Sequence, residues 1–191
     1  MFGFELAARN SGRVRRRVTL YRASYKAAIQ YHKAAEMIYG KVVEDGLIHQ
    51  SAIFPTITLL GFACELYTKA VLYYYSSVPI RVLQANDKKK WASKWNIYKQ
   101  MNHDLGKMYT LFPQNIKVEI LSEFSSKRYS KSKLYTKELF EERLKNAAQS
   151  FVGSRYGYEK EINCYYSGFL LDYAMLLATI CRRVYKGSIN K

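Results

Sequence analysis

Apolar positions recur every three or four residues along most of this chain, which is the spacing of one face of an α-helix. The first run covers residues 14–39, with the face formed by Val14, Val18, Tyr21, Tyr25, Ala28, His32, Ala35 and Tyr39. The opposite side carries a narrow basic stripe of Arg15, Arg22, Lys26 and Lys33. The pattern predicts an amphipathic helix that ends at Gly40.

A second apolar run predicts a helix from Pro55 to about Tyr75. Proline suits the first turn of a helix, because the N–H groups there have no partner within the helix. Glu65 and Lys69 are four residues apart, in the order that favours an ion pair. Residues 81–102 follow as the most polar and least regular part, and we interpret them as a Lys- and Trp-rich insertion or arm.

The second half of the chain shows the same helical spacing in shorter pieces. We expect a short helix that Asn102 or Asp104 caps and that ends at Pro113, a second over residues 114–124, a third that Thr136 opens, and a last one over about residues 163–185. No strand-type alternation of useful length competes with these patterns. The sequence therefore predicts an all-α protein, an up-and-down bundle of four to five main helices.

Composition fits a single domain over residues 1–191 and favours a polyanionic partner. The chain has 191 residues, 49% of them hydrophobic, which is enough for a sizeable core without metal or disulfides. The net charge is +16, and residues 1–17 are a basic N-terminal segment. Such a charge attracts RNA, DNA, nucleotides or acidic proteins, although an excess of lysine also serves solubility.

The cysteines and the apolar runs indicate a cytoplasmic protein outside the membrane. Cys64, Cys164 and Cys181 are widely spaced and form no CxxC pair, as expected in a reducing compartment. The N-terminus lacks a secretory signal pattern. The two most apolar stretches are interrupted by charged residues, Glu65, Lys69 and Asp172, so we expect no membrane span.

Three local patterns occur in a fixed order: GFACELYTKAVL at residues 61–72, NHDLGKMYTLF at 102–112, and FEERLKNAAQSFVGSRYGYE at 140–159. Over residues 50–185 this combination resembles the HEPN superfamily, especially members with an ELxxKxxL helix, a short HDL helix and a WRYxYE-like segment. The resemblance implies a bundle of four or five helices and a homodimer. It also implies a place among bacterial toxin and antitoxin pairs, phage defence or RNA processing.

Catalytic HEPN members carry an Arg and a His separated by four to six residues and cut RNA without metal. The nearest pair here is Arg22 and His32, which a helix would hold roughly 15 Å apart. That departure argues against ribonuclease activity, while an atypical site across a dimer stays open because geometry defines a catalytic site. His103 and Asp104 are further candidates, as an acid and base pair or as capping residues of a short helix.

Arg155 has two interpretations. As a structural latch, its guanidinium would bind Glu65, whose carboxylate lies on a mostly apolar helix and needs a partner, here Arg155 or Lys69. As a ligand or weak catalytic site, it would hold a phosphate together with the neighbouring residues Tyr156, Tyr158 and Glu159.

Basic clusters with aromatic residues between them suit single-stranded nucleic acid, and a solvated surface is the alternative. They are Arg13, Arg15, Arg16 and Arg17; Lys88, Lys89 and Lys90 beside Trp91 and Trp95; and Lys127, Arg128, Lys131 and Lys133 around Tyr129. The histidines and cysteines lack metal-ligand spacing, and no phosphate-binding loop motif occurs, so we predict no metal and no cofactor.

Three functions remain open from these observations. The first is a non-catalytic or weakly catalytic HEPN-like protein of a bacterial conflict system that binds RNA, a nucleotide or an acidic partner protein. The second is a metal-independent ribonuclease toxin with an atypical site. The third is an immunity or antitoxin protein whose basic face covers an acidic toxin.

Overall fold

A computed structural model describes residues 2–44, 50–75, 104–126, 136–154 and 167–189 of the chain. These residues form six helices and no strand: α1 (Phe2–Glu44), α2 (Gln50–Tyr74), α5 (Leu105–Thr110), α6 (Gln114–Ser125), α7 (Lys137–Ser154) and α8 (Ser167–Ile189). The all-α prediction is confirmed for this part of the chain. Residues 81–102, where we expected an insertion, lie outside it.

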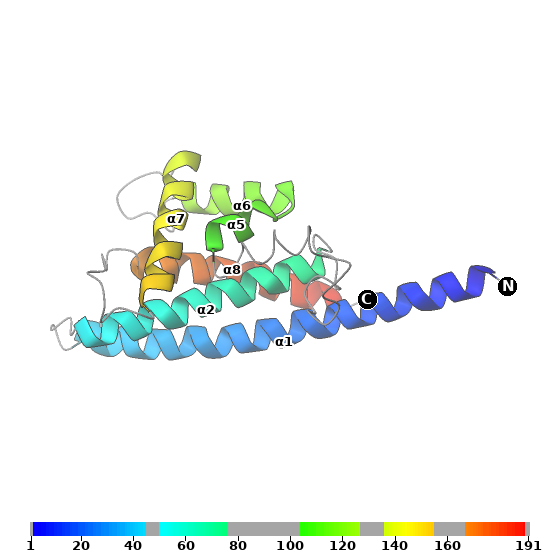
Figure 1. The fold of residues 1–191 in the computed structure, drawn as a ribbon, viewed down its shortest axis with the longest axis horizontal. Helices are drawn as coiled ribbons and strands as arrows, with labels where there is room; N and C mark the ends of the chain where they lie inside the picture. Colours follow the sequence, from blue (N-terminus) through cyan, green and yellow to red (C-terminus); the bar gives the residue numbers. More distant parts are fainter. Residues whose placement is uncertain (1, 45–49, 76–103, 127–135, 155–166, 190–191) are drawn as a thin grey trace.

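The helices form layers on one side of α1 (Figure 1). α1 packs mainly along α2, and α2 packs in turn against α8 and α7. α7 crosses α2 steeply, while α5 and α6 lie on the far side of α8 from α1 (Figure 1). The first turns of α1 project beyond the ends of α2 and α8 (Figure 1).

The predicted apolar face of α1 is buried. Tyr21, Tyr25, Ala28, His32 and Ala35 all lie in the interior, as the spacing predicted. An apolar face that packs along another helix supplies most of the stability of a helix in a protein. This packing explains why α1 forms although it is rich in charged residues.

Two of the predicted helix ends are wrong. Gly40 does not end the first helix, which runs through it to Glu44. Gly40 is exposed, and a glycine within a helix costs only about 1 kcal/mol relative to alanine. Contacts along α2 can offset that cost. Pro55 was expected in the first turn of the second helix, but α2 begins five residues earlier, at Gln50. The proline removes one backbone hydrogen bond of the helix, while Ile57 and Leu60, which follow it, are buried in the core.

The ends of the other helices agree more closely with prediction. Asp104 is the N-cap of α5, and its side chain accepts a hydrogen bond of 3.0 Å from the Lys107 N–H. Thr136 opens α7, since its hydroxyl oxygen accepts from the Leu139 N–H at 3.2 Å. α6 matches the expected residues 114–124 within one position. α8 continues past the expected end at residue 185 to Ile189.

Aromatic side chains form two clusters in the core. One joins α1, α2 and α8 through Tyr21, Tyr25, Tyr67, Tyr74 and Tyr185. The other joins α5, α6, α7 and α8 through Tyr109, Phe112, Phe124, Phe140, Phe169 and Tyr173. The second cluster holds the short helices α5 and α6 against the rest of the protein.

Candidate functional site

Three residues of the basic stripe predicted on α1 are solvent-exposed. Arg22, Lys26 and Lys33 are all exposed, on a different side of α1 from the buried tyrosines and alanines. Arg15 lies on the same helix. The guanidinium carbon of Arg22 lies 5.8 Å from the centre of the Tyr185 ring, a cation–π contact that connects α1 to α8.

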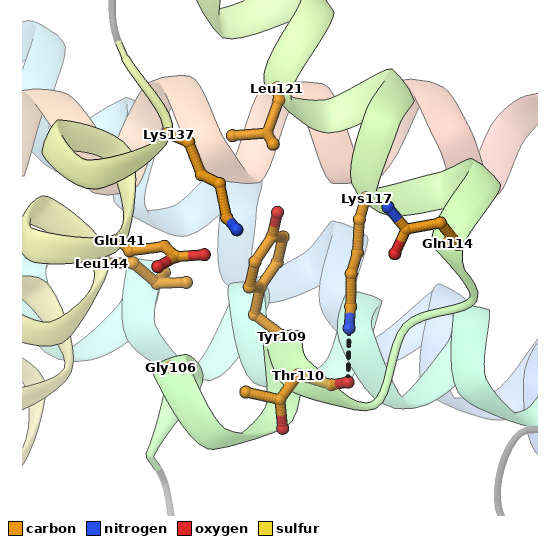
Figure 2. Close-up of a pocket in the computed structure, with 9 residues that line it drawn as sticks. All are labelled: Gly106, Tyr109, Thr110, Gln114, Lys117, Leu121, Lys137, Glu141 and Leu144. Atoms are coloured by element: carbon orange, nitrogen blue, oxygen red, sulfur yellow. Dashed lines mark hydrogen bonds between the residues drawn. The ribbon is translucent and has the colours of Figure 1, made fainter.

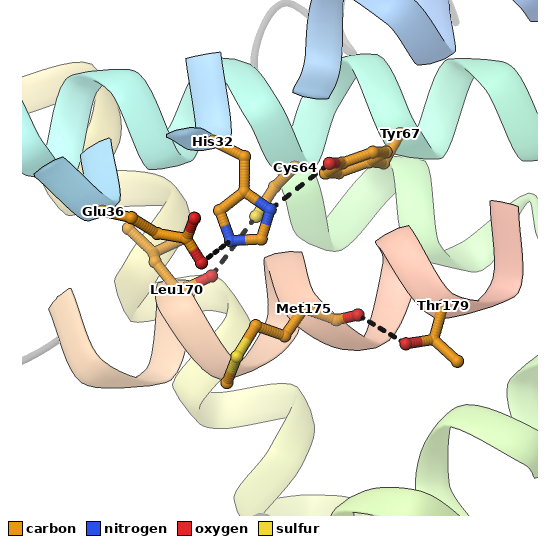
Figure 3. Close-up of polar contacts among 7 residues, drawn as sticks. All are labelled: His32, Glu36, Cys64, Tyr67, Leu170, Met175 and Thr179. Carbon is orange, nitrogen blue, oxygen red and sulfur yellow. Dashed lines mark hydrogen bonds and ion pairs between the residues drawn. The ribbon is translucent and has the colours of Figure 1, made fainter. Parts of the chain in front are cut away.

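His32 lies on the buried side of α1 and is separated from this stripe. Its Nδ1 is 3.3 Å from the Tyr67 hydroxyl, and its Nε2 is 3.7 Å from a carboxylate oxygen of Glu36 (Figure 3). Burial lowers the pKa of His32, and the negative charge of Glu36 opposes this shift. The side chain is therefore neutral at physiological pH and directed into the α1–α2 interface.

Arg22 and His32 do not form one catalytic site. They are ten residues apart on one continuous helix, which separates their Cα atoms by roughly 15 Å, as the sequence indicated. Arg22 is exposed and His32 is 7% exposed. A phosphate bound by Arg22 would lie outside the reach of the His32 ring.

Glu65 is buried and has a cationic partner. Its exposed fraction is 5%, and its carboxylate accepts a hydrogen bond of 2.5 Å from the Lys69 ammonium. The predicted ion pair within α2 is therefore confirmed. The latch between Glu65 and Arg155 stays a prediction, because Arg155 lies outside the described residues.

Several other predicted site residues lie outside the described part of the chain. They are His103, Tyr156, Tyr158 and Glu159, together with the basic and aromatic residues Lys88, Lys89, Lys90, Trp91, Trp95, Lys127, Arg128, Lys131 and Lys133. Asp104, the predicted partner of His103, caps α5 and contacts the Lys107 ammonium at 3.4 Å. Its capping interpretation is confirmed.

The two described cysteines have structural roles. Cys64 and Cys181 are buried free thiols, and burial raises the pKa of both, so they stay protonated. The Cys64 thiol donates to the Leu170 carbonyl oxygen at 3.6 Å (Figure 3), and the Cys181 thiol donates to the Tyr67 carbonyl oxygen at the same distance. Neither is placed as a nucleophile or a metal ligand.

A pocket that sequence reasoning missed lies between α5, α6 and α7 (Figure 2). Its volume is about 340 Å³. Tyr109 lies between two lysines, Lys117 from α6 and Lys137 from α7, and Glu141 lies one turn after Lys137. No motif marks this set, because its members come from three separate helices.

Among the described residues, no group of three His, Cys, Asp or Glu side chains is arranged to hold a metal ion. None of the helices that the structure describes combines the length and the apolarity needed to cross a lipid bilayer. Comparison with known proteins found no match to a protein-family model, to a curated protein or to a solved structure.

Proposed function

We propose that this is a non-catalytic, HEPN-like helical protein that binds single-stranded RNA along the basic stripe of α1. One observation carries the proposal: Arg22, Lys26 and Lys33 are exposed together on one side of a helix whose other side is fixed in the core. A helix held in this way keeps its cations in a row at little conformational cost on binding.

The length of the stripe suits a nucleic acid better than a small anion. Arg15 and Lys33 are eighteen residues apart on α1, a span of roughly 27 Å along the helix axis. A row of cations of this length can follow the phosphates of several nucleotides. The excess of positive charge over the whole chain would add long-range attraction at low salt.

The non-catalytic part of the proposal is supported by the burial of His32. The side chain that would act as acid or base is neutral and faces Tyr67 in the interior. Arg22, the other half of the nearest Arg and His pair, is on the exposed side of the helix. The bundle described here is compatible with the HEPN resemblance, and the homodimer that the resemblance implies is a further prediction, which analytical ultracentrifugation tests.

The test is binding of a fluorescent single-stranded RNA, measured by anisotropy over a series of salt concentrations. The variant Lys26→Glu/Lys33→Glu is compared with Lys145→Glu/Lys186→Glu, which changes two exposed lysines on α7 and α8 and gives the same net charge. The stripe variant should lose affinity and reduce the slope of log affinity against log salt by about 1.4, which is roughly 0.7 for each lost phosphate contact. The control should keep the wild-type slope.

Three outcomes would contradict the proposal. Equal losses in both variants would mean that only net charge matters. RNA cleavage that EDTA does not prevent would favour the ribonuclease toxin, and expression of such a toxin should stop growth. A protein that ignores RNA but forms a stable complex with an acidic protein would favour the immunity function.

A further inference from the structure

The pocket between α5, α6 and α7 is built around a buried tyrosine. Tyr109 is only 5% exposed, and its ring packs against Phe112 and Phe140, with centroids 6.1 Å and 5.2 Å away. Figure 2 shows its hydroxyl pointing between Lys137 and Leu121, into the space that the pocket encloses. The ring is therefore fixed, and its polar end faces the cavity.

The Tyr109 hydroxyl forms no hydrogen bond with any residue that the structure describes. The hydroxyl faces the pocket, so a ligand there can accept a hydrogen bond from it. Burial, with a smaller contribution from the charge of Glu141, raises the pKa of Tyr109 to about 12. The hydroxyl keeps its proton at neutral pH, so it is available as a donor.

Two cations lie beside Tyr109, with Lys137 near its hydroxyl and Lys117 near the Thr110 end of its ring (Figure 2). The Lys117 ammonium donates to the Thr110 carbonyl oxygen at 2.7 Å and lies 5.9 Å from the centre of the Tyr109 ring, which leaves two of its three N–H groups for another acceptor (Figure 2). Within the described part of the chain, Lys137 makes no ion pair, even with Glu141 one turn later. Both ammonium groups can therefore reach an anion in the pocket.

The remaining wall adds the N-terminal end of α6 and the carboxylate of Glu141. Gln114 is the first residue of the twelve-residue helix α6, whose N-cap Pro113 makes no side-chain capping bond. The positive end of the α6 dipole is thus directed toward the pocket edge, which favours a negative group. The Glu141 carboxylate can accept hydrogen bonds from hydroxyl groups but would repel a second anion.

We infer that this pocket binds a small organic phosphate monoester, with its phosphate held by Lys117, Lys137 and the Tyr109 hydroxyl and its hydroxyl-bearing part facing Glu141. Two ammonium groups match the charge of a phosphate dianion. The Glu141 carboxylate, one turn along α7 from Lys137, selects hydrogen-bond donors in the rest of the ligand. A volume of about 340 Å³ is at the small end of the range for ligand pockets. This inference does not depend on RNA binding, because none of its residues belongs to the basic stripe of α1.

The test is isothermal titration calorimetry with ribose 5-phosphate as the probe, with inorganic phosphate and ribose in separate titrations. The wild type should bind ribose 5-phosphate saturably at millimolar concentration or below, inorganic phosphate more weakly, and ribose not at all. Tyr109→Phe and Lys137→Gln should each weaken binding about tenfold, because each removes a hydrogen bond to a charged group.

The control variant Lys186→Gln removes one exposed lysine on α8, outside the pocket, and should bind like the wild type. Tyr109→Phe should keep the wild-type melting temperature, since the hydroxyl it removes faces the pocket and the ring contacts stay in place. Lys137 is exposed, so Lys137→Gln tests the same pocket without a change in the core. Absence of saturable binding by ribose 5-phosphate would overturn the inference.

Two other outcomes would also overturn it. Equal weakening by Lys186→Gln and Lys137→Gln would show that the probe only samples the general positive charge. Equal affinity for inorganic phosphate and ribose 5-phosphate would show that the pocket does not recognise the organic part of the ligand.

Discussion

His32 should make the stability of the protein depend on pH. The side chain is buried between α1 and α2, where its Nδ1 meets the Tyr67 hydroxyl and its Nε2 makes no hydrogen bond. Burial lowers the pKa of His32 below its ordinary value, and Glu36 only partly opposes this shift. Burial also raises the pKa of Tyr67, so the tyrosine stays neutral and offers no charge that would stabilise a protonated imidazole.

The sign of the effect follows from proton binding in the two states. An unfolded histidine takes up a proton near pH 6.5, whereas the buried His32 does so only at lower pH. Below about pH 6.5 the unfolded state therefore binds more protons, and the free energy of unfolding falls as the pH falls. The slope approaches about 1.4 kcal/mol per pH unit, so the loss by about pH 5.5 is up to roughly 1.4 kcal/mol.

The assay is urea denaturation of the wild type and of His32→Asn between about pH 7.5 and pH 5.5, above the range where most carboxylates titrate. His32→Asn keeps a polar atom near the position of Nδ1 but cannot take up a proton. It should be less stable than the wild type at neutral pH and should lose less stability on acidification. An identical pH dependence in His32→Asn and the wild type would refute the reasoning.

Three further substitutions test the packing, each by urea denaturation. Tyr21→Phe removes the hydroxyl that donates to the Cys181 carbonyl oxygen at 2.5 Å and joins α1 to α8, and it should cost about 1 kcal/mol; an unchanged midpoint would mean that the contact contributes nothing. Arg183→Lys removes the bidentate ion pair with Glu119, in which both contacts are 2.6 Å. It should lower the free energy of unfolding by at most about 1 kcal/mol, and by less at high salt, because the arginine is half exposed. Phe140→Ala empties the centre of the second aromatic cluster and should cost about 3–5 kcal/mol, whereas a loss below about 1 kcal/mol would show that the cluster is loosely packed.

The positions of the helices along the chain could be predicted, because burial of one face of a helix makes apolar residues recur every three or four positions in the sequence. Tyr21, Tyr25 and Ala28 fall on the inner side of α1 as the spacing required, since a residue on the wrong side would leave apolar area in water. The helix ends were harder to predict. Gly40 and Pro55 are local signals for an end, but each disfavours a helix by a few kcal/mol at most, and the packing of α1 along α2 exceeds that.

The pocket could not be predicted, because its geometry depends on how three helices meet. Tyr109 has the spacing of an ordinary core residue, and most of its ring does pack in the core. Lys117 and Lys137 are twenty positions apart, and each alone is typical of a solvated surface. Only the way α6 and α7 pack beside α5 places the two lysines on either side of one tyrosine.

The ion pair of Glu65 shows the opposite case, in which sequence reasoning identified a partner correctly. A carboxylate on an apolar helix has to be paired, and a lysine four residues later can reach it whatever the neighbouring helices do. Local pairs of this kind are fixed by helix geometry alone. A latch to Arg155 depends on a second element, which is why the sequence left it as one of two interpretations.

The two sides of α1 limit what chemistry the proposed RNA site can perform. Ten residues at about 100° each place Arg22 and His32 about 80° apart around the helix, in addition to their separation along it. A movement that exposed His32 would break its contact with Tyr67 and open the interface that α1 shares with α2. RNA bound along Arg22, Lys26 and Lys33 would therefore not contact the His32 side chain on the inner side of α1. Cleavage of that RNA would need a group from another part of the chain or from a second copy, so the basic stripe on its own is suited to holding RNA rather than cutting it.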